Sequence, residues 1–250
     1  MKKYILIFLA FLCITSCEDK IEIVKIHTKF GDILLYLYDE TPAHKANFIK
    51  LAKSGFYNGT TFHRIIEYFM IQGGDPNSKD ADPMNDGEGG PAYNGAAGTF
   101  PDPSNEKIYS ISAEIKPNIY HKKGVIAAAR EGDDINPEKR SSGSQFYIVQ
   151  GKVYSDSALT AYAQKRNLTI NEVQRKIYTT VGGTPHLDGK YTVFGEVVSG
   201  FEVVEKIAKQ AKDARDRPIE NIEMTVEIIK VRPKQLMKKY GYTIPQVQAK

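Results

Sequence analysis

The sequence predicts a mostly β fold, a closed antiparallel barrel whose ends are covered by helices. Short apolar segments bounded by turn residues recur along the chain, whereas long helical patterns are few. The first and last of these segments, 23–27 and 222–231, are both strongly apolar, as expected of strands in a closed sheet. With 250 residues, of which 41% are hydrophobic, the chain can bury one sizeable core or two small ones at most.

The domain is expected to begin with a hairpin and a helix. Residues 23–27 and 33–38 are apolar, and Gly31 lies between them at a position that suits a turn. Thr41 is typical of a residue that caps a helix, and a proline follows it at the first helical position. A helix is therefore expected over 42–54, with its apolar face toward the barrel.

The central part contains short strands and one long loop. Residues 61–76 predict two short strands separated by a bend, and residues 75–105 are rich in Gly, Pro, Asp and Asn, which is typical of a loop. Two apolar segments, 124–129 and 145–150, predict buried strands.

The last part predicts helices, two strands and a tail. Residues 155–180 have a helix-forming composition, and a helix is also expected over 201–211. Residues 191–198 and 222–231 predict the last two strands. The tail over 232–250 is polar and basic without a clear core pattern, and we expect its end, 238–250, to be mobile or to be a partner-binding arm.

The first residues have the design of a bacterial secretion signal. Lys2 and Lys3 precede an apolar run that is too short to span a bilayer as a mature helix. The ending ITSC resembles the bacterial lipobox, whose cysteine becomes the lipidated first residue. We therefore expect residues 1–16 to be a lipoprotein signal peptide, Cys17 to carry the lipid, and 17–22 to be a tether.

Composition limits the remaining possibilities. The only cysteines are Cys13 and Cys17, so the exported body would have neither a disulfide nor a thiolate metal site. The histidines show no metal-ligand spacing, and we expect no metal or cofactor. The formal charge of +4 includes the two lysines of the leader, and the rest is mixed, so nucleic acid is not an expected partner. Nothing requires more than a monomer, held at a membrane of the cell envelope.

One stretch, TFHRIIEYFMIQGGDP, places polar residues among apolar ones. Strand periodicity groups Arg64 with Phe62 and Ile66, opposite His63. If the two short strands pair as a hairpin, Arg64 can meet Met70 and Gln72. A solvated arginine on an edge strand is the simpler interpretation, but the apolar neighbours argue against it.

This stretch resembles the signature of the cyclophilin-type peptidyl-prolyl cis-trans isomerases. Three further segments match in family order: 124–129, SSGSQFYIV at 141–149, and HLDGKYTVFGEV at 186–197. The resemblance covers about 23–231 and implies an eight-stranded antiparallel barrel with two capping helices. By the resemblance Arg64 is the catalytic arginine, and the matching substrate-binding positions are Phe69, Met70, Gln72, Ala129, Arg130, Gln145, Tyr147, His186, Leu187 and Tyr191.

The implied chemistry explains why these residue types are needed. Rotation about a prolyl bond is slow because amide resonance opposes it. In the twisted transition state the nitrogen recovers its lone pair, and a fixed guanidinium can donate a hydrogen bond to it. An apolar pocket would hold the pyrrolidine ring of a proline-containing polypeptide, so the reaction requires no cofactor.

The sequence departs from the common family pattern at five places. Four are substitutions: Tyr147 for phenylalanine, His186 for tryptophan, Tyr191 for histidine and Arg130 for asparagine. The fifth is a helical insertion over 152–184, expected near the pocket rim, which either guides substrates or simply packs on the barrel. A rival hypothesis is a peptide-binding or chaperone module in which catalysis is incidental and the insertion supplies the working surface.

Overall fold

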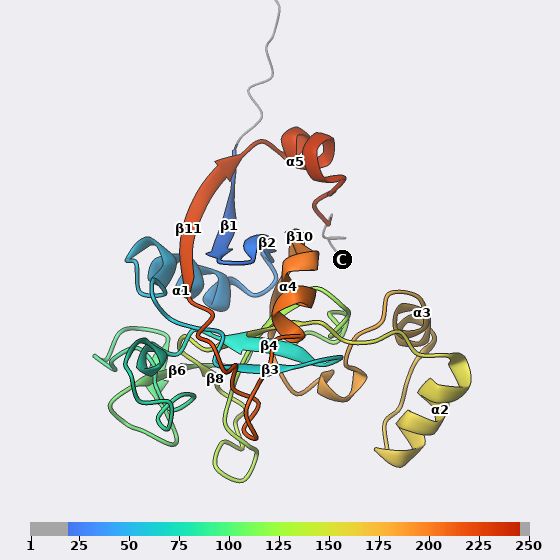
Figure 1. Ribbon diagram of the computed structural model, residues 1–250. Coiled ribbons are helices and arrows are strands. Elements are labelled where there is room, and N and C mark those ends of the chain that lie inside the picture. Colours follow the sequence, from blue (N-terminus) through green and yellow to red (C-terminus); the bar gives the residue numbers. More distant parts are fainter. Residues whose placement is uncertain (1–19, 246–250) are drawn as a thin grey trace, which may run out of the picture.

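An antiparallel sheet of eight strands forms the centre of the protein in the computed structural model, which describes residues 20–245 (Figure 1). In hydrogen-bonded order the strands are β11 (Met224–Val231), β1 (Ile21–Thr28), β2 (Gly31–Leu37), β10 (Val193–Ser199), β7 (Val125–Ala128), β9 (Phe146–Val149), β4 (Met70–Gly73) and β3 (Arg64–Ile66). A smaller sheet contains β5 (Thr99–Pro101), β6 (Tyr109–Ile111) and β8 (Ser141–Ser142). The mostly β expectation is confirmed.

The expected closure of the barrel is wrong, because the sheet curls without closing. Its edge strands are β11 and β3, and β3 has only three residues. Between these edges the described structure has a single bridge, Thr61 to Glu223, supported by a 2.9 Å hydrogen bond from Phe62 N to the Ile222 carbonyl. So short a strand offers too few backbone groups for a full ladder, and the seam stays open.

Five α-helices accompany the strands in residues 20–245, with bounds Pro42–Lys53 for α1, Asp156–Lys165 for α2, Glu172–Thr180 for α3, Phe201–Ala208 for α4 and Pro233–Tyr240 for α5. The two helices expected to cover the barrel are α1, which contacts β11, and α4, which contacts β2, β3 and β4. Within 20–245, none of these helices is long and apolar enough to cross a membrane.

The two faces of the sheet are packed separately. Along β9, Phe146 and Ile148 lie in the main core with Phe48 of α1, as the alternation of strand side chains requires. Tyr147 and Val149 lie in a second cluster on the opposite face. The candidate site described below is on this second face, so the core supports it from behind.

The expected cap of α1 is supplied by another residue. Thr41 precedes the helix, but its side chain makes no capping hydrogen bond. Instead the carboxylate of Glu114 accepts the backbone N–H groups of Ala43 at 3.2 Å and His44 at 3.0 Å, and it also lies 2.7 Å from His44 Nδ1. A carboxylate there satisfies the free N–H groups and complements the helix dipole.

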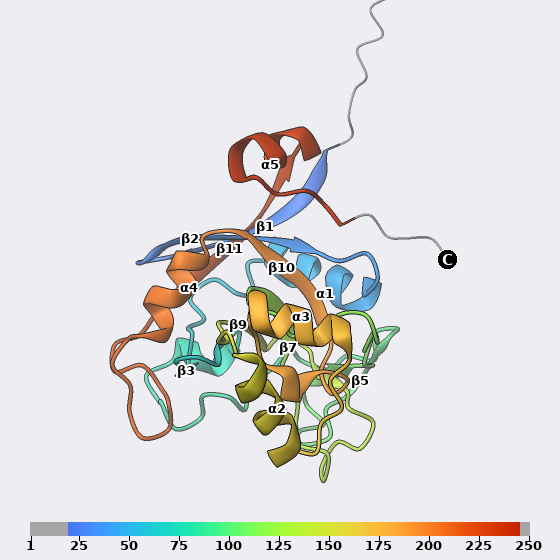
Figure 2. The same ribbon diagram turned by 90° about the vertical axis from the view of Figure 1, so that its right-hand side faces the viewer.

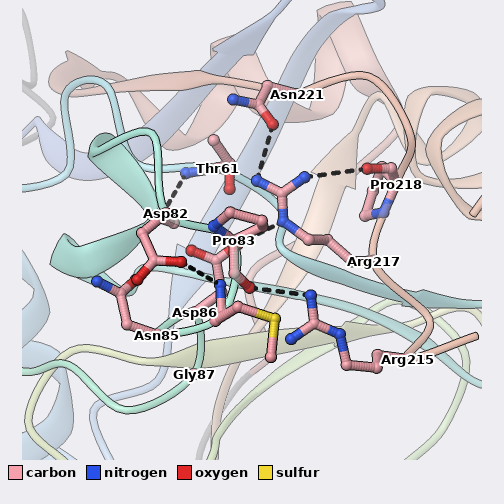
Figure 3. Close-up of polar contacts among 12 residues, drawn as sticks. Thr61, Asp82, Pro83, Asn85, Asp86, Gly87, Arg215, Arg217, Pro218 and Asn221 are labelled. Carbon is pink, nitrogen blue, oxygen red and sulfur yellow. Dashed lines mark hydrogen bonds and ion pairs between the residues drawn. The ribbon is translucent and has the colours of Figure 1, made fainter. Parts of the chain in front are cut away.

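The long loop after β4 is fixed to the loop after α4. Arg217 Nε lies 2.6 Å from Asp86 Oδ2, and Arg215 donates to the Pro83 carbonyl at 3.2 Å (Figure 3). The same guanidinium of Arg217 reaches Asn221 Oδ1 at 3.0 Å. These contacts hold the stretch that leads into Gly87 and Gly89, whose carbonyls belong to the site.

The insertion forms two helices rather than one. Helices α2 and α3 contact each other and project from the barrel (Figure 1). They share a small core in which Leu159 and Tyr178 are fully buried. The two helices of the insertion thus pack against each other.

The tail contains a helix in the part that the structure describes. Residues 233–240 form α5, and Leu236 is only 1% exposed against the second face of the sheet. The chain continues to Tyr242, whose hydroxyl donates to Glu196 Oε1 at 2.7 Å. Figures 1 and 2 place α5 at the end of the molecule where β1 begins. The predicted signal peptide and Cys17 lie outside the described residues.

Candidate active site

The β3–β4 hairpin brings the expected polar residues together. Arg64 pairs with Gln72 and Ile66 with Met70, so these four side chains share the second face of the sheet. The grouping of Arg64 with Met70 and Gln72 is confirmed. The grouping of Phe62 with Arg64 is wrong, because the regular strand begins only at Arg64 and Phe62 turns into the main core.

A chain of side-chain amides orients the arginine. Gln72 Oε1 accepts from Arg64 at 3.4 Å, and Gln72 Nε2 donates to Gln145 Oε1 at 3.2 Å. Gln145 Nε2 in turn donates to the carbonyls of Gly87 and Gly89, at 2.7 and 2.9 Å. Every link fixes the next, so the position of the guanidinium depends on the loop at Gly87–Gly89.

Asp75 holds that loop from inside the protein. Its side chain is fully buried and accepts the backbone N–H groups of Asn77 at 2.8 Å, of Gly87, and of Gly89 at 3.3 Å. The residue before Asp75 must be a glycine, because the chain passes close to Ser144 at this position. Gly74 has φ +87°, and a Cβ at this position would lie 2.6 Å from the Ser144 carbonyl oxygen.

Arg64, Gln72 and Gln145 line a pocket of about 290 Å³. This volume is near the lower end of the range for small-ligand sites. Ten of the expected site residues lie in its lining, namely Arg64, Phe69, Met70, Gln72, Ala129, Arg130, Gln145, Tyr147, Leu187 and Tyr191. Phe69, Met70, Tyr147 and Leu187 supply apolar walls, and Arg64 lies at the same cavity. The pocket therefore offers an apolar recess beside a fixed positive charge.

Tyr147 has a partner for its extra hydroxyl. The side chain is buried, and the hydroxyl oxygen lies 3.0 Å from His121 Nε2. His121 Nδ1 lies 3.1 Å from Asp188 Oδ1, which follows directly after the pocket residue Leu187. Burial raises the pKa of Tyr147 well above its ordinary value, so it stays neutral.

Arg130 and Tyr191 form another wall of the pocket. The Arg130 guanidinium lies 4.6 Å from the centre of the Tyr191 ring and donates to the Lys190 carbonyl at 2.9 Å. It also pairs with Asp133 at 2.6 Å. These contacts fix the guanidinium of Arg130 against the Tyr191 ring.

His186 lies behind the pocket and does not line it. Its ring is 5.5 Å from that of Phe69, and its Nδ1 lies 2.8 Å from the hydroxyl of Tyr162 in α2. Burial, assisted by the positive charge of Arg166, lowers the pKa of His186 to about 4. At neutral pH the neutral ring therefore supports a wall residue.

His63 is not among the residues that line the pocket. It is buried, and neither ring nitrogen has a hydrogen-bond partner in the described protein. Burial lowers its pKa, although the nearby charges of Asp75 and Asp86 act in the opposite direction. The neutral form is thus favoured.

Several supporting residues could not be found from the sequence pattern. His121, Asp75 and Asp188 are separated along the chain and belong to no periodic segment. The one local signal was the hydroxyl of Tyr147, which a buried position obliges to find a partner.

The comparisons with known proteins agree with this geometry. Residues 23–228 match the family described as cyclophilin type peptidyl-prolyl cis-trans isomerase/CLD. A protein of Staphylococcus haemolyticus named as a peptidyl-prolyl cis-trans isomerase is 36% identical over 212 residues, which cover 84% of this chain and 91% of that protein. A longer Streptococcus pyogenes protein, named as a bifunctional phosphatase and isomerase, is 36% identical over 219 residues, but the match covers only 38% of it.

A solved structure extends the likeness to the fold. The crystal structure of a Cryptosporidium parvum cyclophilin type peptidyl-prolyl cis-trans isomerase superposes with a TM-score of 0.57 at 26% identity. It covers 84% of this chain and 97% of that one. A second structure of that protein, obtained in the presence of the dipeptide Ala-Pro, has a TM-score of 0.56. With its family match over 23–228, its relatives and its fold, this chain belongs to the cyclophilin-type peptidyl-prolyl cis-trans isomerases.

Proposed function

We propose that Arg64 lowers the barrier to prolyl isomerisation by donating a hydrogen bond to the imide nitrogen as the bond twists. The observation that carries this is the position of Arg64 on the pocket of Phe69, Met70, Tyr147 and Leu187. A ring held in that recess has its nitrogen beside the guanidinium. The hydrogen bond strengthens only when the nitrogen lone pair is released, so it favours the transition state over the bound substrate.

The substrate classes follow from the same arrangement. The apolar recess fits the pyrrolidine ring, and Gln72 and Gln145 orient Arg64 through the amide chain. Ala129 and Arg130 also line the pocket, and the residues before the proline would lie there. We assign proline-containing polypeptides as substrates, bound by a monomer without a cofactor.

The amide chain gives a direct test. In Gln72→Leu the volume is nearly kept but both hydrogen bonds of the amide are lost. We expect kcat/KM for a short proline peptide to fall about tenfold, because an arginine without its orienting partner samples unproductive positions. The rate would be measured as the cis-to-trans conversion of the peptide.

A matched control is Gln210→Leu, the same change at a residue whose side chain donates to the Lys206 carbonyl of α4. This variant should keep the full rate. Equal rates in Gln72→Leu and the unaltered protein would contradict the orienting role of the amide chain.

We further propose that the isomerase is an exported, lipid-anchored protein that assists the folding of cell-envelope proteins. The support is the leader sequence, in which a basic start and an apolar run end in ITSC at Cys17. Acyl chains on Cys17 would hold the protein at a membrane, since each buried methylene contributes about 0.8 kcal/mol.

The anchor can be tested by fractionation in a bacterial host. The unaltered chain should sediment with membranes and incorporate labelled palmitate, whereas Cys17→Ala should do neither. Cys13→Ala is the matched control, because it removes the other cysteine and leaves the lipidation residue in place. Labelling that persists in Cys17→Ala would overturn the assignment.

A further inference from the structure

We propose that the insertion 152–184 positions the proline pocket through one carboxylate, Asp188, which Tyr178 and Gln174 of α3 hold and which in turn fixes Leu187 and Tyr147. These residues are positioning residues, because they act on the pocket through others. The inference rests on the proposed pocket and goes beyond it, since it gives the insertion a part in the reaction.

The contacts converge on the two oxygens of Asp188. Oδ2 accepts from the Tyr178 hydroxyl at 2.6 Å and from Gln174 Nε2 at 2.8 Å. Oδ1 accepts from the backbone N–H of His121 at 2.7 Å and lies 3.1 Å from its Nδ1. A carboxylate fully supplied with donors in this way has one position only.

The same arrangement decides the direction of the hydrogen bond to the pocket. Since an ionised carboxylate only accepts, Nδ1 of His121 donates to Asp188. When the ring is neutral, Nε2 is then an acceptor, and the Tyr147 hydroxyl at 3.0 Å donates to it. Although burial raises the pKa of Asp188, hydrogen bonds from His121 and Tyr178 hold it below its ordinary value, which keeps the carboxylate ionised at neutral pH.

Burial makes this network rigid. Tyr178 is 0% exposed, His121 1% and Tyr147 5%. In such surroundings water cannot replace a lost partner, so each hydrogen bond constrains the group that it reaches. The pocket wall at Tyr147 is therefore connected to Tyr178 of helix α3 through His121 and Asp188, without solvent between them.

The backbone links the insertion to the same wall. Gly183 N donates to the Lys152 carbonyl at 3.0 Å, which joins the two ends of the insertion. Thr184 N donates to the His121 carbonyl at 2.9 Å, and Leu187 N to the Thr184 carbonyl at 3.1 Å. Leu187, a wall of the pocket, is thus placed by the end of the insertion on one side and by Asp188 on the other.

The experiment uses Tyr178→Phe, which removes one donor to Asp188 and keeps the buried ring. We expect kcat/KM for a proline peptide to fall about fivefold, mainly as an increase in KM, because the pocket that receives the ring is less well placed. Tyr147→Phe should give a similar loss. The double variant should lose no more than the larger single loss, because both changes break one connected unit.

The control is Arg175→Gln, on the same helix. Arg175 pairs with Asp156 of α2 at 2.6 Å on the exposed side of the insertion and does not contact the network. Its KM should equal that of the unaltered protein even if the melting temperature falls. Should Tyr178→Phe fail to fold, Gln174→Glu replaces the second donor by a like charge, yet keeps the oxygen that accepts from Asn171 N at the start of α3.

The outcomes separate this inference from the proposed catalysis. An unchanged KM in folded Tyr178→Phe, or in Gln174→Glu if that variant is needed, would make the insertion a merely structural addition. Losses that multiply in the double variant would also overturn the inference. If Arg64→Ala stays fully active while Tyr178→Phe alters KM, the arginine mechanism fails and the positioning role stands.

Discussion

Replacing Arg64 by alanine is expected to lower kcat/KM for a proline peptide by about 100- to 1,000-fold, with most of the loss in kcat. This is the usual effect of removing a donor that stabilises charge mainly in the transition state. The guanidinium is partly buried at a pocket where Phe69, Met70, Tyr147 and Leu187 supply apolar walls, so water would replace it poorly. The measurement is the cis-to-trans rate of the peptide with each purified protein.

Two further measurements show whether the loss of rate is due to the missing guanidinium. The fold of Arg64→Ala should be intact, with a melting temperature close to that of the unaltered protein, because Arg64 lies on the three-residue strand β3 and outside both cores. Arg64→Lys should recover only part of the rate, since an ammonium cannot reproduce the planar fork of donors. A folded Arg64→Ala with the full rate would leave the pocket as a binding surface and favour the rival chaperone hypothesis.

The hairpin at the site could be predicted because its information is local. Alternation along two adjacent strands is enough to place Arg64, Met70 and Gln72 on one face, and the register of β3 and β4 agrees. Phe62 was misplaced for the same local reason, since alternation holds only inside a regular strand. A local pattern also could not predict whether the barrel closes. Closure depends on how many residues of β3 can pair with β11.

The supporting groups depend on contacts between distant segments. Glu114 caps α1 from 70 residues away, and Asp188 meets His121 across 67 residues. No spacing rule marks such pairs, because the fold must first bring the segments together. Helix α5 shows the same limit, since its buried residue Leu236 packs against the second face of the sheet, and the local sequence does not show that this face lies nearby.

The insertion changes how the rival hypothesis can be tested. Deleting residues 152–184 would remove the working surface that the rival hypothesis requires. Because Tyr178 and Gln174 hold Asp188 beside Leu187, the deletion would also disturb the pocket. Single changes such as Tyr178→Phe therefore separate the roles more cleanly than removal of the whole segment.

The largest loss of stability is expected for Phe146→Ala. Phe146 is 1% exposed in the main core, where its ring lies 5.4 Å from that of Phe48, 5.9 Å from Tyr57 and 6.2 Å from Phe62, all edge to face. Removing the ring loses its burial and leaves a cavity among rigid neighbours, so the free energy of unfolding should fall by about 3–5 kcal/mol. Urea denaturation followed by circular dichroism measures this change.

The matched control is Phe100→Ala, which removes the same ring from β5, where it is 41% exposed and stacks on Arg140. Its cost should stay near 1 kcal/mol or below. Phe146 also lies between Gln145 and Tyr147, whose side chains serve the site on the opposite face. A cavity behind them should let both shift, so kcat/KM of the folded variant should fall as well. An equal cost for the two phenylalanines would mean that the core does not support the site as described.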